Sequence, residues 1–183
     1  TLCRSSAASD VYKRQSYHLH HVAGKVVALA EFEAFGQAYA TDIVRNAKAF
    51  AESLAAEGFD VLAESRGYTA SHQVLTRHGD TDSGAGAVAA RRLEDAGIIT
   101  NMNMLPGDTK AMSPSGLRLG VQELTRVGMG VNEMAEVASL YARVLLKQEA
   151  PELVRNDVQH LKSDFQHVQY CFDSESIPAY EGM

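Results

Sequence analysis

The sequence predicts an α+β domain in which helices pack on a small, mostly antiparallel sheet. Two long stretches near the start carry apolar residues at every third or fourth position, which is the helical period. Short apolar runs bounded by polar turns follow in the middle, and two more amphipathic stretches close the chain. The expected order of helix, helix, strand, strand, helix, strand, strand, helix, helix is typical of this class.

The first segment is excluded from the fold prediction. The stretch SSAASDVYKRQ, residues 5–15, has neither a helical nor a strand period, and no cap precedes an apolar run. Translated back into DNA, it resembles the end of a transposon-based sequencing adapter, with residues 1–4 as flanking primer. We therefore interpret residues 1–15 as a non-native, adapter-derived segment and expect the authentic chain to begin near Ser16, inside a longer protein.

Composition limits the function classes of the remaining 168 residues, which suit one domain. Excluding the first segment lowers the formal net charge from −6 to −8, and an acidic chain without a basic stripe argues against nucleic acid or an anionic membrane as partner. No apolar run is long enough to span a bilayer. Cys171 is then the single cysteine, which fits a reducing cytoplasm.

The amino-terminal half predicts two helices followed by two strands. The first helix is expected from Leu19 to Phe35, and the second continues from Phe35 until Gly58 stops it. FDVLAE and SHQVLTR then predict strands at 59–64 and 71–77. We expect residues 16–57 to be long helices that link to a missing large domain, and residues 58–183 to form a small α+β domain.

The carboxyl-terminal half predicts a helix, two strands and two helices. Proline and glycine make the segment LPGDTKAMSPSG a rigid loop that can present side chains. The expected elements are a helix at 88–96 closed by Gly97, strands at 98–100 and 117–121, a helix capped by Asn132, and a last helix with Pro151 in its first turn.

The motif HLHH places His18, His20 and His21 at the start of the first helix, where His18 and His21 share one face. A metal site needs three or four ligands with supporting partners, and no acidic residue follows until Glu31. We interpret the motif as a polar helix start and expect no metal.

The motif PSGLRLG places Arg118 between Leu117 and Leu119 on an apolar strand. Such a guanidinium must find an anion, because an unpaired buried charge is costly. Its planar fork suits a carboxylate bound through two hydrogen bonds. A salt bridge to one of the chain's own acidic residues is the alternative.

The motif NMNMLPGD places Asn101 and Asn103 two residues apart at a strand end, so both point to the same side. A carboxamide can form two hydrogen bonds with a heterocycle that carries a donor beside an acceptor. It also builds turns, and both interpretations remain open at this point.

Three segments, HVAGKVVALAE, AGIITNMNMLPGD and PSGLRLGVQELTRVGM, together resemble the carboxyl-terminal part of serine hydroxymethyltransferase. The resemblance covers residues 17–146, and the tail QYCFD is similar to archaeal-type members. It implies the small domain of a fold-type-I (aspartate aminotransferase-like) enzyme dependent on pyridoxal 5′-phosphate, assembled as a homodimer or a dimer of dimers. It also implies one-carbon transfer between serine and a tetrahydropterin such as tetrahydrofolate.

By this resemblance, Arg118 matches the arginine that binds the carboxylate of the amino-acid substrate, and Asn103 matches the asparagine that helps to bind the pterin. His21 with Val22 matches the start of the helix that leaves the large domain. The family's cofactor lysine lies in an upstream motif that this sequence lacks, and Lys25 and Lys48 are not candidates. We therefore expect a fragment with no catalytic residue of its own and no activity alone.

The resemblance leaves alternatives for the substrate. Val121, Gln122 and Glu123 stand where common bacterial members have Thr-Pro-Ala, which puts the pterin in question. Relatives with the same scaffold are 2-methylserine hydroxymethyltransferases, or threonine transaldolases that need no folate, and each would need Arg118. From another class, a non-catalytic α+β interaction module would fold alone without an exposed apolar face.

Overall fold

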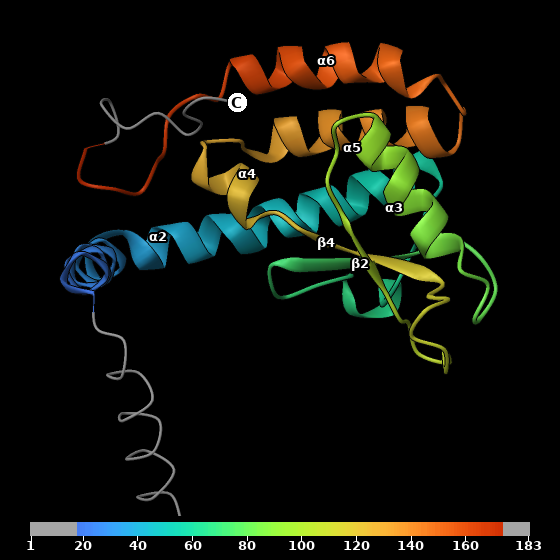
Figure 1. Cartoon of the computed structure of the whole chain (residues 1–183), viewed down its shortest axis with the longest axis horizontal. Helices are drawn as coiled ribbons and strands as arrows, with labels where there is room; N and C mark the ends of the chain where they lie inside the picture. Colours follow the sequence, from blue (N-terminus) through green and yellow to red (C-terminus); the bar gives the residue numbers. More distant parts are fainter. Residues whose placement is uncertain (1–17, 174–183) are drawn as a thin grey trace, which may run out of the picture. The chain divides into compact units, whose positions relative to one another are not determined.

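The computed structural model describes residues 18–173, in two compact units that divide after Gln37 (Figure 1). The helices are α2 (Leu19–Glu57), the 3-10 helix η1 (Glu64–Arg66), α3 (Ala85–Asp95), α4 (Gln122–Arg126), α5 (Val131–Leu145) and α6 (Pro151–Ser163). The strands are β1 (Asp60–Val61), β2 (Gln73–Arg77), β3 (Asn101–Asn103) and β4 (Gly116–Gly120). The α+β prediction is therefore confirmed.

The four strands form one sheet in the order β1-β2-β4-β3, with every neighbouring pair antiparallel. Side chains alternate between the two faces of a strand. On β4, Leu117 and Leu119 are buried in the hydrophobic core. Val74 on β2 pairs with Leu119 and is buried as well, so this face packs on helices, whereas Arg118 on the opposite face is exposed.

Helices α3, α5 and α6 pack together on the buried side of the sheet. In Figure 1, α5 and α6 run side by side, and their contacts confirm that they are neighbours. Tyr141 on α5 meets Phe50 on α2 edge to face, with ring centroids 5.8 Å apart. The part of α2 that follows Gln37 thus belongs to the same core.

The prediction of two opening helices is wrong, because α2 is continuous from Leu19 to Glu57. Gly36 stands where the two periodic stretches meet, and a single glycine weakens a helix without ending it. The predicted stop is confirmed, since α2 ends before Gly58, which has φ +103°.

Two strand predictions are corrected. The strand expected at 98–100 lies at 101–103 instead, because the N–H of Ile98 donates to the carbonyl of Leu93 and closes α3. The strand expected at 59–64 is limited to Asp60–Val61, because Ala63 is left-handed with φ 64° and starts η1.

Two helix starts also differ from the predictions. The cap of α5 is Gly130, whose N–H donates to Glu133 Oε2 at 2.7 Å, and not Asn132. The short helix α4 was not predicted, whereas Pro151 does open α6. Among residues 18–173 we find no helix that has both the length and the apolar character needed to cross a membrane.

Candidate functional site

The face of the sheet opposite the core brings together three of the side chains that the sequence singled out. Arg118 is exposed between two buried leucines of β4, so it projects from the face opposite the core. The register places Asn101 directly opposite Arg118 and Asn103 opposite Gly116. Residues directly opposite in an antiparallel pair share a face. Arg118, Asn101 and Asn103 therefore lie on one surface, which we call the arginine face.

Two side chains cover the strand on either side of Arg118. A Cβ atom at Gly116 would lie 2.4 Å from Leu105 Cγ, and one at Gly120 would lie 2.5 Å from Gln122 Oε1. Because Gly116, Arg118 and Gly120 alternate onto the same face, Leu105 and the Gln122 carboxamide both lie on the arginine face. They border Arg118 before and after it along β4.

The neighbours of Arg118 in the sheet supply no negative charge. Leu75 of β2 lies opposite Arg118 on one side, and Asn101 of β3 lies opposite it on the other. Within residues 18–173, the guanidinium of Arg118 makes no ion pair or hydrogen bond, so the alternative of an internal salt bridge is not found there. Its five N–H donors are available to a ligand.

Asn103 has a local hydrogen bond. Its Nδ2 donates to the carbonyl of Met104 at 2.6 Å, which is the turn-building use of an asparagine amide. Its Oδ1 has no hydrogen-bond partner within the described part of the chain. The side chain thus keeps an acceptor at the edge of the arginine face.

Asp108 holds the loop between β3 and β4. Its Oδ2 accepts the N–H of Leu105 at 2.9 Å, the N–H of Ser115 at 2.9 Å and the hydroxyl of Ser115 at 2.8 Å. Its Oδ1 accepts the N–H of Asp82 at 2.8 Å. These donors, first of all the Leu105 N–H, hold the pKa of Asp108 well below its usual range.

Asp82, in the neighbouring loop, accepts hydrogen bonds from the two residues that follow Asp108. Its Oδ1 accepts the N–H groups of Thr109 and Lys110 at 2.7 and 2.8 Å, and its Oδ2 accepts the Thr109 hydroxyl at 2.7 Å. The Thr109 hydroxyl is the main cause of the lowered pKa of Asp82. The sequence prediction missed this pair of aspartates, which we call the aspartate clasp. An aspartate after Pro-Gly is a turn signal, but its distant partner is not visible in the sequence.

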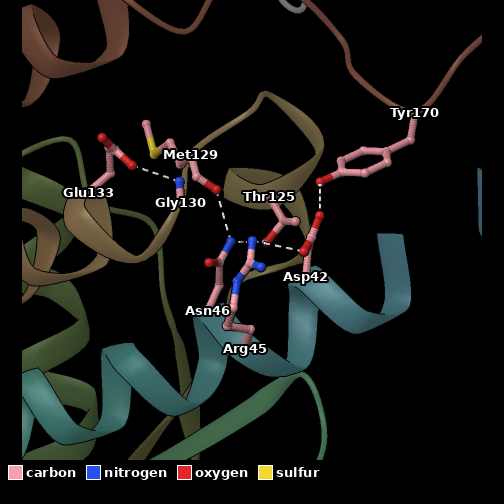
Figure 2. Close-up of polar contacts among 8 residues, drawn as sticks. All are labelled: Asp42, Arg45, Asn46, Thr125, Met129, Gly130, Glu133 and Tyr170. Atoms are coloured by element: carbon pink, nitrogen blue, oxygen red, sulfur yellow. Dashed lines mark hydrogen bonds and ion pairs between the residues drawn. The ribbon is translucent and has the colours of Figure 1, made fainter. Parts of the chain in front are cut away.

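A second missed residue lies on the buried side. Asn46 of α2 is 1% exposed, and its Nδ2 donates to Thr125 Oγ1 at 3.0 Å and to the carbonyl of Met129 at 2.8 Å. Figure 2 shows this amide reaching from α2 to α4 and to the turn that follows it. Asn46 thereby holds the segment that leaves β4.

The tail is attached to the same part of α2. Tyr170 donates its hydroxyl to Asp42 Oδ2 at 2.6 Å, and the other oxygen of Asp42 pairs with Arg45 at 2.8 Å (Figure 2). Burial, followed by the contact with Asp42, raises the pKa of Tyr170 to about 12. Residues after α6 therefore return to α2.

The histidine motif forms a separate cluster at the start of α2. The ring centroids of His18, His20 and His21 lie 4.2–5.4 Å apart, and all three residues are exposed. In the part of the chain that the structure describes, no group of three or more His, Cys, Asp or Glu residues is placed to hold a metal ion.

Comparisons with known proteins identify the family to which this fold belongs. The family model of serine hydroxymethyltransferase matches residues 12–141. A serine hydroxymethyltransferase of Pyrococcus abyssi is 53% identical over 160 residues, which are 86% of this chain and 38% of that protein. One from Methanopyrus kandleri is 49% identical over 188 residues, which cover 98% of this chain and 43% of that protein. The chain thus spans about two fifths of these curated relatives.

Among solved structures, L-threonine transaldolase from Pseudomonas fluorescens, crystallised in its internal aldimine state, is similar with a TM-score of 0.72 and 34% identity. The match covers 80% of this chain and 33% of that one. The fold is that of the carboxyl-terminal α+β domain of a fold-type-I pyridoxal-phosphate enzyme. Within this class, the chain belongs to the serine hydroxymethyltransferase family.

Proposed function

We propose that this chain is the carboxyl-terminal part of a serine hydroxymethyltransferase in which Arg118 binds the carboxylate of the amino-acid substrate. The observation that supports it is the exposed guanidinium on an apolar strand, with no carboxylate partner among residues 18–173. The parent enzyme transfers a one-carbon unit between serine and a tetrahydropterin. Residues 16–57 link to the large domain and residues 58–183 form the small domain of a cytoplasmic homodimer or dimer of dimers.

Arg118 would bind and orient the substrate. Two parallel hydrogen bonds from the guanidinium fix both oxygens of a carboxylate and hence the rotation of the amino acid. Such positioning brings the bond that reacts into the correct direction and lowers the entropic part of the barrier. Asn101 and Gln122 border this position with carboxamides, which add no competing charge.

Pyridoxal phosphate supplies the electron sink for this chemistry when it is bound. None of the strand residues that form the arginine face is a lysine, so the face fits a substrate carboxylate and does not fit covalent attachment of the aldehyde. We therefore assign to this chain binding and orientation of the substrate, and no covalent step.

Asn103 is proposed to bind the pterin co-substrate, tetrahydrofolate or a related pterin. Its unpaired Oδ1 at the edge of the arginine face supports this role. The similarity to a threonine transaldolase supports a second candidate, a related enzyme that releases acetaldehyde from threonine and joins the remaining glycine unit to another aldehyde, without a pterin. A 2-methylserine hydroxymethyltransferase would use the same Arg118.

The test replaces Arg118 in the full-length enzyme. Arg118→Lys keeps one positive charge but loses the planar fork, and we expect the KM for serine to rise about tenfold or more, while Arg118→Ala abolishes binding. Steady-state kinetics with serine measures both. Asn103→Ala separates the candidates, because it should raise the KM for tetrahydrofolate and leave pterin-independent aldol cleavage unchanged.

Near-normal kinetics of Arg118→Ala would contradict the carboxylate assignment. Equal loss of both reactions in Asn103→Ala would contradict its pterin role. Formation of a new β-hydroxy amino acid from threonine and an added acceptor aldehyde, with release of acetaldehyde and no response to tetrahydrofolate, would favour the transaldolase.

A further inference from the structure

One carboxylate joins the ends of the two strands that carry the proposed binding residues. Asn103 is the last residue of β3, and Leu105 follows two positions later. Ser115 immediately precedes β4, three positions before Arg118. Asp108 Oδ2 accepts hydrogen bonds from the backbone N–H groups of both Leu105 and Ser115, each at 2.9 Å.

The atoms held by Asp108 also shape the arginine face. Leu105 is 3% exposed, and its side chain fills the space above Gly116, next to Arg118. Ser115 is fully buried and gives its hydroxyl to the same oxygen of Asp108 at 2.8 Å. A shift of either backbone would therefore move the border of the face where the ligand carboxylate lies.

The second half of the aspartate clasp limits where Asp108 can move. Its Oδ1 accepts the N–H of Asp82, whose own carboxylate accepts two N–H groups from Thr109 and Lys110. The two loops are therefore joined at Asp108 and at the two residues that follow it. Neither carboxylate touches Arg118 or Asn103, so the clasp can act on a ligand only through the backbone.

We propose that Asp108 is a positioning residue that sets the places of Arg118 and Asn103 together, so that both ligands of the parent enzyme depend on it. This inference rests on the proposed function. A variant of Arg118 should weaken amino-acid binding, and a variant of Asn103 should weaken pterin binding. Loss of the aspartate clasp should weaken both.

The experiment compares Asp108→Asn with Asp80→Asn in the full-length enzyme. Asparagine has the shape of aspartate but only one acceptor oxygen, so it cannot accept all four donors of Asp108. Asp80 is two residues from Asp82, and its side chain makes no hydrogen bond or ion pair among the described residues. Asp80→Asn therefore removes the same charge without changing the clasp.

Two readouts are measured on each variant. Hydrogen exchange of the Leu105 and Ser115 amides reports the clasp itself, without substrate or cofactor turnover. The KM values for serine and for tetrahydrofolate, with kcat, report the ligand sites. For Asp108→Asn we expect faster exchange of both amides and a rise of both KM values by about ten- to a hundredfold, with a smaller change in kcat. Asp80→Asn should match the wild type.

Faster exchange with unchanged KM values would overturn the inference, because the clasp would then be only structural. A change in one KM alone would overturn it too. If Asp108→Asn does not fold, Ser115→Ala removes only one donor to Asp108, and it should shift both KM values in the same direction by less. Normal serine kinetics in Arg118→Lys would reject the proposed function, and the amide exchange would still report the clasp.

Discussion

Asn46 is a buried amide that links a helix to the segment leaving the central strand. Its two donated hydrogen bonds end on Thr125 Oγ1 and on the Met129 carbonyl, and the Thr125 hydroxyl in turn donates to Val121 at 2.8 Å. Its own Oδ1 is buried without a partner among the described residues. The two hydrogen bonds that Asn46 donates therefore have to offset the cost of its unpaired buried oxygen.

Asn46→Ala should destabilise the chain. It leaves the Met129 carbonyl without this donor and opens a small space, which costs about 1–3 kcal/mol in the free energy of unfolding. Urea unfolding of the 183-residue chain measures it. The control is Asn132→Ala on the exposed start of α5, with an expected change within about 0.5 kcal/mol. Equal effects of the two substitutions would contradict the account.

At the residue scale, the sequence indicates that Arg118 lies on a strand between two leucines. It predicts a buried charge that needs an anion, whereas the structure shows an exposed side chain. It does not predict that no acidic side chain among residues 18–173 pairs with Arg118, since that depends on which loops pass the face. Asp108 and Asn46 were missed for a related reason. Asp82, the partner of Asp108 in the other loop, lies 26 positions away, and both partners of Asn46 lie 79 or more positions away, distances that no local pattern encodes.

Among the elements, α3 and β4 approach each other through glycines. A Cβ atom at Gly86 would lie 2.3 Å from the carbonyl oxygen of Gly116 and 2.8 Å from its nitrogen. Backbone atoms cannot rotate away as a side chain can, so the helix itself would have to move. Gly86 therefore sets the distance between α3 and the strand that carries Arg118.

Gly86→Ala should cost about 1–3 kcal/mol of the free energy of unfolding, because it overpacks this contact. Gly24→Ala is the matched control on α2, where nothing lies within 4 Å of an added Cβ. There the better helix propensity of alanine should stabilise by about 0.5–1 kcal/mol. Urea or thermal unfolding of both variants tests the prediction, and a neutral Gly86→Ala would contradict it.

The aspartate clasp should make the free energy of unfolding depend on pH in the acidic range. The pKa values of Asp82 and Asp108 are lowered in the folded chain, so the folded state resists protonation more than the unfolded state does. Their stabilising contribution is complete above the unfolded pKa of about 4 and is lost as the pH falls below it.

The stability gap between wild type and Asp82→Asn or Asp108→Asn should therefore shrink below about pH 4. Chemical unfolding at a series of pH values measures this gap. Asp80→Asn, in the same loop, removes a charge without removing a hydrogen bond of the clasp and serves as the control. A stability difference between wild type and the clasp variants that grows as the pH falls below about 4 would contradict this prediction.

Element types were predictable where periodicity is long, and element boundaries were not. The sequence shows the stop of α2 at Gly58 and the proline start of α6, because both residues act locally. The place of β3 depends instead on where β4 offers free backbone groups, at Arg118 through Gly116. Pairing with β4 therefore places the strand at Asn101–Asn103 and not at the apolar residues 98–100, where the sequence predicts its start.

For the whole molecule, the unit that ends at Gln37 exposes large apolar side chains along α2. They follow the helical period and are Leu19, Val22, Val26, Leu29 and Phe32. An exposed apolar stripe of this kind marks a surface that another chain or segment covers. A self-contained interaction module is not expected to have such a stripe, so its presence supports the proposal of a missing large domain.

We propose that this chain supplies the carboxylate-binding arginine to a pyridoxal-phosphate enzyme whose cofactor lysine is encoded upstream. The most direct measurement is to amplify the source locus across the Gln15–Ser16 junction without transposon tagging and to read the upstream sequence. We expect an open reading frame for a large domain with its cofactor lysine in place of SSAASDVYKRQ. The same eleven codons in the genome, with no such domain before them, would contradict it.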